Sequence, residues 1–410
     1  MVTDINAGAK PGGKTSKPGS SPVGAKEILL RRGFLISQNL FSLLGQQAIM
    51  FLLYLFSRIS NKYIFTGMKA LVLEKYNEFV YKDVPEPVIG NNEVLIKVMA
   101  CGICGSDVYG MDGSTGRRIP PMIMGHEASG VIVKIGSEVR CWKPGDRVTF
   151  DSTVYPLNDW FTLEGMYNLS DNREVLGVSP GTYKRDGAFA DYIAIPSHIL
   201  YKIPDSVSFE QAAMVEAVAV ALHSINISEL KTGDKCVVVG AGMIGIFIIK
   251  LLRISGASKI IAIDINSKRL EQAINAGADQ TFLSTEEDLD EKIKVITGYR
   301  GADISFEAVG KSESVNIAID ILSKGGKVVL VGNVSPKIEF PLQKVVTSEI
   351  KVLGSCAIRG EYEVVLDLLQ SGMISVDDQI SAIAPLSEGA IWFNKLYKRE
   401  EELNKVILVP

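Results

Sequence analysis

A thiol, an imidazole and a carboxylate lie in one glycine-rich stretch of the sequence, between positions 101 and 127. Cys104 stands near its start, and His126 and Glu127 stand at its end. Sulfur, nitrogen and oxygen donors in this mixture suit a borderline-soft ion such as zinc. A catalytic zinc takes three protein ligands and keeps one position open for water or substrate. The stretch therefore predicts half of a catalytic metal site, although a lone His-Glu pair is more often structural.

A second group of residues has the spacing of a dinucleotide-binding turn. Its glycines follow an apolar strand-like run and open a helix-like run. Glycines at this spacing allow a tight turn and close approach of the backbone to a pyrophosphate, while the helix N-terminus offers unpaired N–H groups to the phosphates. A glycine turn that serves packing alone is the alternative. The predicted cofactor-binding segment comprises Gly240, Gly242, Met243, Ile244 and Gly245.

Asp264 ends the next strand-like run, 19 residues beyond Gly245. A carboxylate at this place accepts hydrogen bonds from the ribose hydroxyls of the adenosine, and its charge repels a 2′-phosphate. The sequence thus favours NAD over NADP. Lys268 and Arg269 follow closely, so NADP remains the alternative cofactor. Arg269 is also a candidate cofactor contact.

Length, charge and cysteine content narrow the class of protein. At 410 residues the chain can hold about two domains of ordinary size and an extra segment. A net charge of -4 and dispersed charged residues give no electrostatic footprint for nucleic acid. Five cysteines are too few for a disulfide framework, which fits a reducing compartment such as the cytoplasm.

Residues 1–67 are predicted to be an extension ahead of the enzyme. Residues 1–25 are rich in Gly, Lys, Pro and Ser, so we expect them to be disordered. Residues 33–57 carry no charge and are flanked by arginines, as a membrane anchor would be. Glutamines interrupt this run, and Met68 offers a second plausible start. We expect a segment outside the enzyme proper; a membrane anchor at 33–57, or a helix packed on the body or on a partner, are the alternatives.

The remaining sequence changes its pattern near Pro204. Short β-like runs separated by turn residues come before it and predict a compact, barrel-like β domain. Strand-like and helix-like runs alternate after it and predict a parallel, doubly wound sheet. The last run, KVILVP, could rejoin the first domain. The predicted divisions are a catalytic β domain at 68–220, a nucleotide-binding domain at 221–355 and a return to the first domain at 356–410.

Several motifs occur in the order that one enzyme family has. They are C-G-x-C-G-S-D ending at Asp107, G-H-E-A-S-G at 125–130, P-G-D-R-V at 144–148, G-A-F-A-D-Y at 187–192, the pair Val215-Glu216, and the glycine fingerprint. In these motifs residues 68–410 resemble the zinc-dependent medium-chain alcohol and polyol dehydrogenases, and within them the sorbitol and iditol branch. The resemblance implies a chaperonin-10-like β domain, a Rossmann domain and an active site in the cleft between them.

The resemblance also implies an activity. It implies transfer of a hydride from a secondary alcohol, such as a polyol or sugar alcohol, to NAD, with one catalytic zinc per subunit and a homodimer or homotetramer. Gly332 and Asn333 match positions that contact the nicotinamide. Glutamate at position 216 argues for the polyol branch, because the classical alcohol dehydrogenases have cysteine there. The metal ligands would be Cys104, His126, Glu127 and Glu216.

The proton path is expected to run along the residues after Cys104. Ser106 is the expected first proton acceptor, and the proton then passes through the cofactor ribose and Tyr109 to solvent. Glu127 is counted among the catalytic residues for its place in or beside the metal site. Relatives often have histidine in place of Tyr109. A phenol titrates near 10 and an imidazole near 6.5, so the last step of the relay stays open. Asp107 is expected to orient His126 from behind.

Three more residues have both a functional and a structural interpretation. His223 lies seven residues after Glu216, two helical turns on, so both could face the cleft, or His223 could be packed in the core. Arg117 and Arg118 could meet a phosphorylated or acidic substrate, or they could be solvated surface residues.

One departure from the family concerns a second metal. The family's structural-zinc lobe carries four cysteines, and hydroxyls with one carboxylate do not replace four thiolates. We therefore expect no structural zinc, and a lobe held by packing of Tyr155, Trp160 and Phe161. The positions that match the four cysteines are Pro156, Asp159, Thr162 and Ser170.

Two other classes of protein share this scaffold. One is a zinc-free relative of the quinone-reductase type, and retention of Cys104, His126, Glu127 and Glu216 argues against it. The other is a non-catalytic NAD-binding relative. Metal analysis distinguishes both from a dehydrogenase, because each alternative predicts no bound zinc.

Overall fold

The computed structural model describes residues 67–178, 184–399 and 403–410. The predicted extension at 1–67, with its candidate anchor at 33–57, lies outside the described residues except for its last position. Within the described ranges, every helix is too short or too polar to pass through a membrane.

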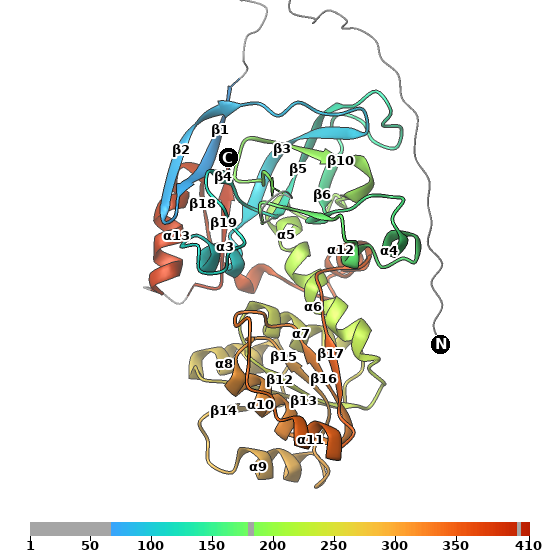
Figure 1. Ribbon diagram of the computed structural model, residues 1–410. Helices are drawn as coiled ribbons and strands as arrows, with labels where there is room; N and C mark the ends of the chain where they lie inside the picture. The colour runs from blue at the N-terminus through green and yellow to red at the C-terminus, as the bar shows by residue number, and fades with distance from the viewer. Residues whose placement is uncertain (1–66, 179–183, 400–402) are drawn as a thin grey trace, which may run out of the picture. The chain divides into compact units, whose positions relative to one another are not determined.

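The first part of the described chain is built of β-strands, as predicted (Figure 1). Its main sheet has the order β11-β6-β5-β3-β19-β18, and β10 pairs with the first half of β3. These strands are β3 (Glu93–Gly102), β5 (Glu127–Ile135), β6 (Arg147–Phe150), β10 (Tyr192–Pro196), β11 (Leu200–Lys202), β18 (Ile380–Pro385) and β19 (Lys405–Val409). Two three-stranded sheets lie beside it, one of β2 (Glu78–Pro85), β1 (Gly67–Lys75) and β4 (Met122–Ile123), the other of β7 (Thr153–Val154), β8 (Glu174–Leu176) and β9 (Lys184–Arg185).

The C-terminal strand returns to this sheet. β19 pairs antiparallel with the end of β3, where Ile407 faces Gly102 and Leu408 faces Cys101. Val406 and Leu408 point into the β-domain core, as alternate residues of a strand share one face. This pairing brings Lys405 next to the stretch that carries Cys104.

The second sheet is parallel, in the order β14-β13-β12-β15-β16-β17 (Figure 1). Its central strand β12 buries side chains on both faces: Cys236 and Val238 lie in one apolar cluster, and Val237 and Val239 in another. Helices and the neighbouring strands supply the rest of each cluster, so the predicted doubly wound sheet is confirmed. The strands are β12 (Lys235–Val239), β13 (Lys259–Asp264), β14 (Gln280–Leu283), β15 (Ala302–Glu307), β16 (Leu322–Leu330) and β17 (Lys351–Gly354).

Helices cover this parallel sheet and connect it to the β part. The helical run predicted around Glu216 is two helices, because Met214 leaves the helical ladder between them. This break places Glu216 in the first turn of α6, which runs through position 220, the predicted domain boundary. The helices are α3 (Gly105–Gly110), α4 (Trp160–Leu163), α5 (Phe209–Ala213), α6 (Val215–Ser228), α7 (Met243–Ile254), α8 (Ser267–Ala276), α9 (Leu289–Ile296), α10 (Ser312–Asp320), α11 (Leu342–Thr347), α12 (Tyr362–Gln370) and α13 (Gly389–Lys398).

Candidate metal centre and cofactor site

Cys104 is held at the N-terminus of α3. Its backbone is extended, and its sulfur accepts a hydrogen bond from the backbone N–H of Ser106 at 3.4 Å. The carboxylate of Asp107 accepts in return from the N–H of Cys104 at 3.3 Å, which completes a capping box. The local sequence thus fixes the direction of the thiol before any metal is considered.

His126 and Glu127 are placed by a tight turn into β5. Gly125 has a φ of +98°, and a Cβ there would lie 2.9 Å from the sulfur of Cys101, so only glycine fits. Glu127 begins β5 and pairs with Gly102 of β3. A Cβ on Gly102 would lie 2.5 Å from the Glu127 carboxylate, so this glycine leaves the room that the carboxylate occupies.

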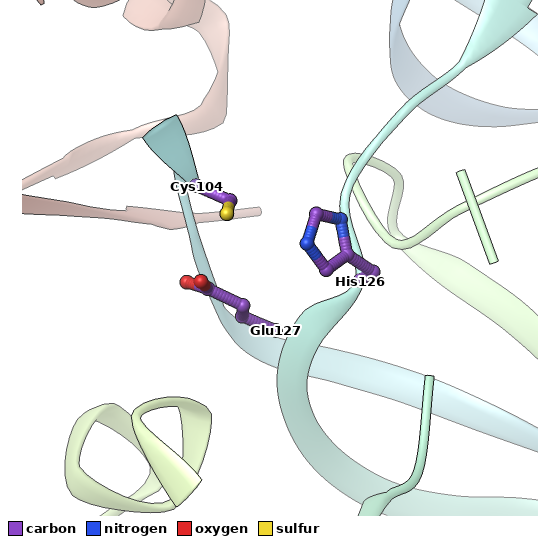
Figure 2. A group of neighbouring side chains, drawn as sticks. All are labelled: Cys104, His126 and Glu127. Carbon is purple, nitrogen blue, oxygen red and sulfur yellow. The ribbon is translucent and has the colours of Figure 1, made fainter. Parts of the chain in front are cut away.

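The three side chains form one compact group. One ligand atom from each of Cys104, His126 and Glu127 lies within 4.8 Å of the other two, and Figure 2 shows the sulfur, ring and carboxylate close together from two stretches of chain. His126 and Glu127 are 5% and 1% exposed. Oε1 of Glu127 has no hydrogen-bond partner among the described residues, and Nδ1 of His126 has only the long contact of 3.5 Å to Asp107. A buried carboxylate oxygen without a partner fits a metal ion, since buried polar atoms otherwise find partners.

Lys405 compensates the charge of Glu127, a role that sequence reasoning missed. Its ammonium group is fully buried and donates to Oε2 of Glu127 and, at 3.1 Å, to the carbonyl of Ile103. Burial lowers the pKa of Lys405, but negative neighbours, Glu127 first, outweigh this and raise it. The pKa of Cys104 is raised, first because the thiol is removed from water and next by the charge of Glu127. A thiolate at this place therefore needs a cation beside it.

Glu216 lies near this group without joining it. It is half-buried in the first turn of α6, and Ser152 Oγ donates to it at 3.5 Å. Burial raises the pKa of Glu216 to about 7, while His126 lowers it and Glu127 raises it. The structure thus brings together three of the four predicted ligands within 4.8 Å, and Glu216 is outside that limit.

The residues predicted to carry protons lie on α3. Ser106 Oγ donates to the sulfur of Cys104 at 3.1 Å and accepts from Nη2 of Arg118 at 3.1 Å. Tyr109 is 43% exposed at the other end of this short helix, and its hydroxyl accepts from Arg399 at 2.7 Å. Asp107 is fully buried, with Oδ1 at 3.5 Å from Nδ1 of His126. That distance is too long for a good hydrogen bond, although the carboxylate faces the ring.

The structure overturns both interpretations considered for Arg118 and selects one of the two considered for His223. Arg118 is 1% exposed and donates to Asp107 at 2.6 Å, so it is neither a solvated surface residue nor free to meet a substrate, whereas Arg117 is exposed. His223 is buried, and its Nδ1 lies 2.8 Å from Oε1 of Glu361. His223 is therefore a packed and paired histidine on α6, the structural interpretation of the two considered.

The glycine fingerprint joins β12 to α7. Gly240 has a φ of +100°, and a Cβ there would meet Val309 at 2.6 Å. A Cβ on Gly245 would lie 1.9 Å from the Gly240 carbonyl, so strand and helix need this glycine to pack. Gly242 caps α7 without a side-chain hydrogen bond, and a Cβ there would meet nothing within 4 Å. Open space before a free helix N-terminus is what a pyrophosphate requires.

Asp264 ends β13 beside this turn. Its carboxylate is 6% exposed and accepts from the N–H of Ala241 at 2.7 Å and of Asn266 at 2.9 Å. Nη1 of Arg269 lies 3.9 Å away. These bonds fix the negative charge at the end of the strand, next to the open space before α7. Met243 and Ile244 are half-buried in the first turn of α7 and pack against its apolar core.

The loop after β16 also needs a glycine, because its backbone lies close to the backbone of the loop after β15. A Cβ on Gly332 would lie 2.2 Å from the N of Gly310, and Asn333 beside it is exposed. Glu307, at the end of β15, holds this arrangement and was missed by sequence reasoning. Its buried Oε1 accepts from the N–H groups of Val309 and Gly310 at 2.9 and 2.8 Å.

Comparisons with known proteins identify the family. Residues 90–205 match the alcohol dehydrogenase GroES-like domain, and residues 244–371 match the zinc-binding dehydrogenase domain. Sorbitol dehydrogenase of Bacillus subtilis is 33% identical over 349 residues, which cover 84% of this chain and 98% of that protein. The chain belongs to the zinc-dependent medium-chain polyol dehydrogenases.

Two further relatives agree with this membership. D-xylulose reductase of Saccharomyces cerevisiae is 34% identical over 76% of this chain and 89% of its own length. A zinc-binding dehydrogenase of Sinorhizobium meliloti solved with NADP is 29% identical, with a TM-score of 0.77 over 84% of this chain and all of that one. The predicted family, fold class and activity as a zinc-dependent oxidoreductase acting on CH–OH groups are confirmed, and nothing found favours the zinc-free or non-catalytic alternatives.

In this dehydrogenase, hydrogen bonds hold the segment that matches the family's structural-zinc lobe. Asp159 caps α4 by accepting from the N–H of Thr162 at 2.9 Å, and its second oxygen accepts from the hydroxyl of Ser170. Hydrogen bonds thus join three of the four positions that match the cysteines of the family's structural-zinc lobe. The predicted packing is only partly right, since Tyr155 stacks on Tyr167 at 4.2 Å while Trp160 is 63% exposed.

Proposed function

We propose that this chain oxidises a secondary hydroxyl of a polyol or sugar alcohol, with NAD as the hydride acceptor and one zinc ion per subunit. The observation that carries the proposal is the buried thiol, imidazole and carboxylate group of Cys104, His126 and Glu127, with ligand atoms within 4.8 Å of one another. Glu216, half-buried nearby, is the proposed fourth metal ligand. The relatives named sorbitol dehydrogenase and D-xylulose reductase support a polyol as substrate.

The chain's own groups have distinct tasks in this reaction. A zinc ion bound here supplies Lewis acid chemistry, which lowers the pKa of an alcohol so that its proton is lost near neutral pH. Ser106 Oγ donates its hydrogen to Cys104 and accepts one from Arg118, so one of its two lone pairs is left to accept a hydrogen bond from the alcohol. Ser106 takes up the alcohol proton only as its own hydrogen passes on to the next acceptor. Tyr109, exposed on the same helix, is the proposed next acceptor.

The cofactor is proposed to lie against the glycine fingerprint. The open space at Gly242 takes the pyrophosphate, and the loop of Gly332 and Asn333 borders the nicotinamide. Asp264 accepts from the adenosine ribose, and its fixed negative charge disfavours the 2′-phosphate of NADP. Arg269 is the proposed contact on the ribose side, 3.9 Å from Asp264.

Three further proposals concern the whole protein. The hydrogen bonds of Asp159 support the absence of a structural zinc. All five cysteines are unpaired, which supports a reducing compartment such as the cytoplasm. A homodimer or homotetramer is proposed, and sedimentation of the purified protein tests it. The domain divisions at 68–220, 221–355 and 356–410 stay predictions that limited proteolysis can test.

Metal analysis and a polyol screen test the activity. We expect about one zinc per subunit, and NADH formation with at least one member of a panel of sugar alcohols and vicinal diols. Cys104→Ala should lose both the zinc and the NADH formation. Cys236→Ala, which removes a buried thiol from β12 far from the ligand group in sequence, is the control and should keep both. Full activity in Cys104→Ala, or a zinc-free active wild type, would refute the proposal.

Cofactor choice has its own experiment. We expect Asp264→Ser to bind NAD more weakly and to discriminate less between NAD and NADP, because the substitution removes the fixed negative charge. Asp279→Ser is the matched control: Asp279 accepts from the N–H of Ile260 at 2.7 Å, at the other end of β13. A preference for NADP in the wild type would contradict the assignment of Asp264.

A further inference from the structure

Arg118 is buried beside the metal centre. Its side chain is 1% exposed, and only one of its nitrogens, Nη2, makes the bonds seen: to Oδ1 of Asp107 at 2.6 Å and to Oγ of Ser106 at 3.1 Å. Gly110 makes room for it, because a Cβ on Gly110 would lie 2.7 Å from Cδ of Arg118. Burying a guanidinium costs free energy unless it is paired, so we expect Arg118 to have a specific role where it is.

The two groups that Arg118 binds each face a metal ligand. Ser106 Oγ donates to the sulfur of Cys104 at 3.1 Å. Asp107 Oδ1, the atom that takes the hydrogen bond from Arg118, is also the atom 3.5 Å from Nδ1 of His126. One guanidinium nitrogen therefore bonds to the outer neighbours of two of the three ligands.

The charges around the ligand group explain why a cation is needed there. Glu127 is paired with Lys405 inside the protein, so its charge is already compensated. Asp107 is fully buried too, and without Arg118 its carboxylate would have only the long contact to His126 and the N–H of Cys104 at 3.3 Å. It would then be free to turn, and the carboxylate that faces His126 would no longer be held in place.

We propose that Arg118 is a positioning residue of the metal centre: through Ser106 and Asp107 it orients Cys104 and His126, and it thereby sets how tightly the protein retains zinc. This inference rests on the proposed function, since it assigns a role toward the same metal. Arg118 touches neither the ligand atoms nor the open space before α7, so its effect passes through its two partners. Groups that orient metal ligands from outside typically change metal affinity by about 10–100-fold when they are removed.

A purely space-filling Arg118 makes a different prediction. If the side chain only filled its cavity, a methionine of similar length would preserve the site, and any loss would appear in global stability alone. If it positions the ligands, Arg118→Met should release zinc more easily even where the protein remains folded. Arg118→Lys keeps the charge but presents no planar fork, so it should restore part of the affinity.

The experiment compares full-length Arg118→Met, Arg118→Lys and wild type by zinc competition with a chromogenic chelator and by the visible spectrum of the cobalt-substituted protein. We expect zinc affinity to fall about 10–100-fold in Arg118→Met and less in Arg118→Lys, with a changed thiolate-to-cobalt band in both. Arg117→Met, which removes the exposed cation next in sequence, should match the wild type. Thermal unfolding of each zinc-loaded protein shows whether the variant is folded.

Wild-type affinity and an unchanged cobalt spectrum in Arg118→Met would overturn the inference. Should Arg118→Met fail to fold, Arg118→Lys decides, because wild-type affinity and spectrum in that variant would equally overturn it. A wild type that binds no zinc refutes the proposed function instead, so the two failures are distinguishable.

Discussion

One half-buried and one fully buried tyrosine allow a sharp test of hydrogen-bond energetics in this protein. Tyr167 and Tyr362 each stack on another tyrosine, with ring centroids 4.2 and 4.7 Å apart respectively. The hydroxyl of Tyr167 donates to Oδ2 of Asp151 at 2.9 Å and accepts from the N–H of Gly360 at 2.8 Å. The hydroxyl of Tyr362 is fully buried and has no hydrogen-bond partner among the described residues. Phenylalanine at either position keeps the stacked ring and removes only the hydroxyl.

The expected changes in the free energy of unfolding have opposite signs. Tyr167→Phe loses a bond to a carboxylate, worth about 1.5–3 kcal/mol, and a bond to an exposed backbone N–H near the low end of about 0.5–1.5 kcal/mol. The sum predicts a loss of about 2–4 kcal/mol. Tyr362→Phe removes a buried hydroxyl whose desolvation costs about 1–3 kcal/mol and is not offset by a hydrogen bond. The substitution should therefore leave the free energy of unfolding unchanged or raise it by up to that amount.

Urea unfolding of both variants and wild type, at one zinc and NAD content, measures this difference. The two variants are each other's control, because both convert a stacked tyrosine into phenylalanine. Equal destabilisation by the two substitutions would contradict the reasoning, since it would mean that the hydroxyl of Tyr362 has a partner as valuable as those of Tyr167.

The pH dependence of Tyr167→Phe adds a second measurement. Burial raises the pKa of Asp151 to about 6, and the bonds from Thr153 and Tyr167 lower it in part. The folded pKa thus exceeds the unfolded value of about 3.9, so this group's stabilisation is complete below about pH 4 and is lost as the pH rises through 6, at up to about 1.4 kcal/mol per unit. Because Tyr167 favours the ionised carboxylate, Tyr167→Phe should cost more at pH 8 than at pH 5. Asp151→Asn should abolish this difference.

Two further predictions concern the cofactor turn and the lobe. Gly242→Ala should fold normally but bind NAD more weakly, because its methyl would enter open space, whereas Gly245→Ala should lose thermal stability because its Cβ would lie 1.9 Å from the Gly240 carbonyl; calorimetry measures both. Asp159→Ala should make the lobe more sensitive to protease by releasing Ser170 and the N-terminus of α4, while chelator treatment of the wild type should not.

The ligand group could be predicted from sequence because short-range geometry positions it. Cys104 is fixed by its own capping box, and Gly125 imposes the turn that directs His126. The fingerprint is equally local, since its glycines are required by contacts within one strand, turn and helix. In each case the residue types that do the chemistry also determine the backbone around them.

Other residues depend on contacts that no local pattern reveals. Lys405 reaches Glu127 across 278 positions and only because β19 pairs with β3. Helical spacing placed His223 on the same side of α6 as Glu216, but that helix is buried on nearly all sides, so the spacing could not tell which neighbour His223 meets. Its partner Glu361 comes from the segment before α12.

The buried charges of the metal centre divide in the same way between local and distant residues. The acidic members, Asp107 and Glu127, belong to motifs and sit beside the ligands or among them. The cations that offset them, Arg118 and Lys405, come from an irregular loop and from the last strand. Without these cations, two buried carboxylates would carry uncompensated charge inside the protein and would lose the partners that hold them in place. The motif thus predicts which atoms bind zinc, whereas residues outside it determine how those atoms are held.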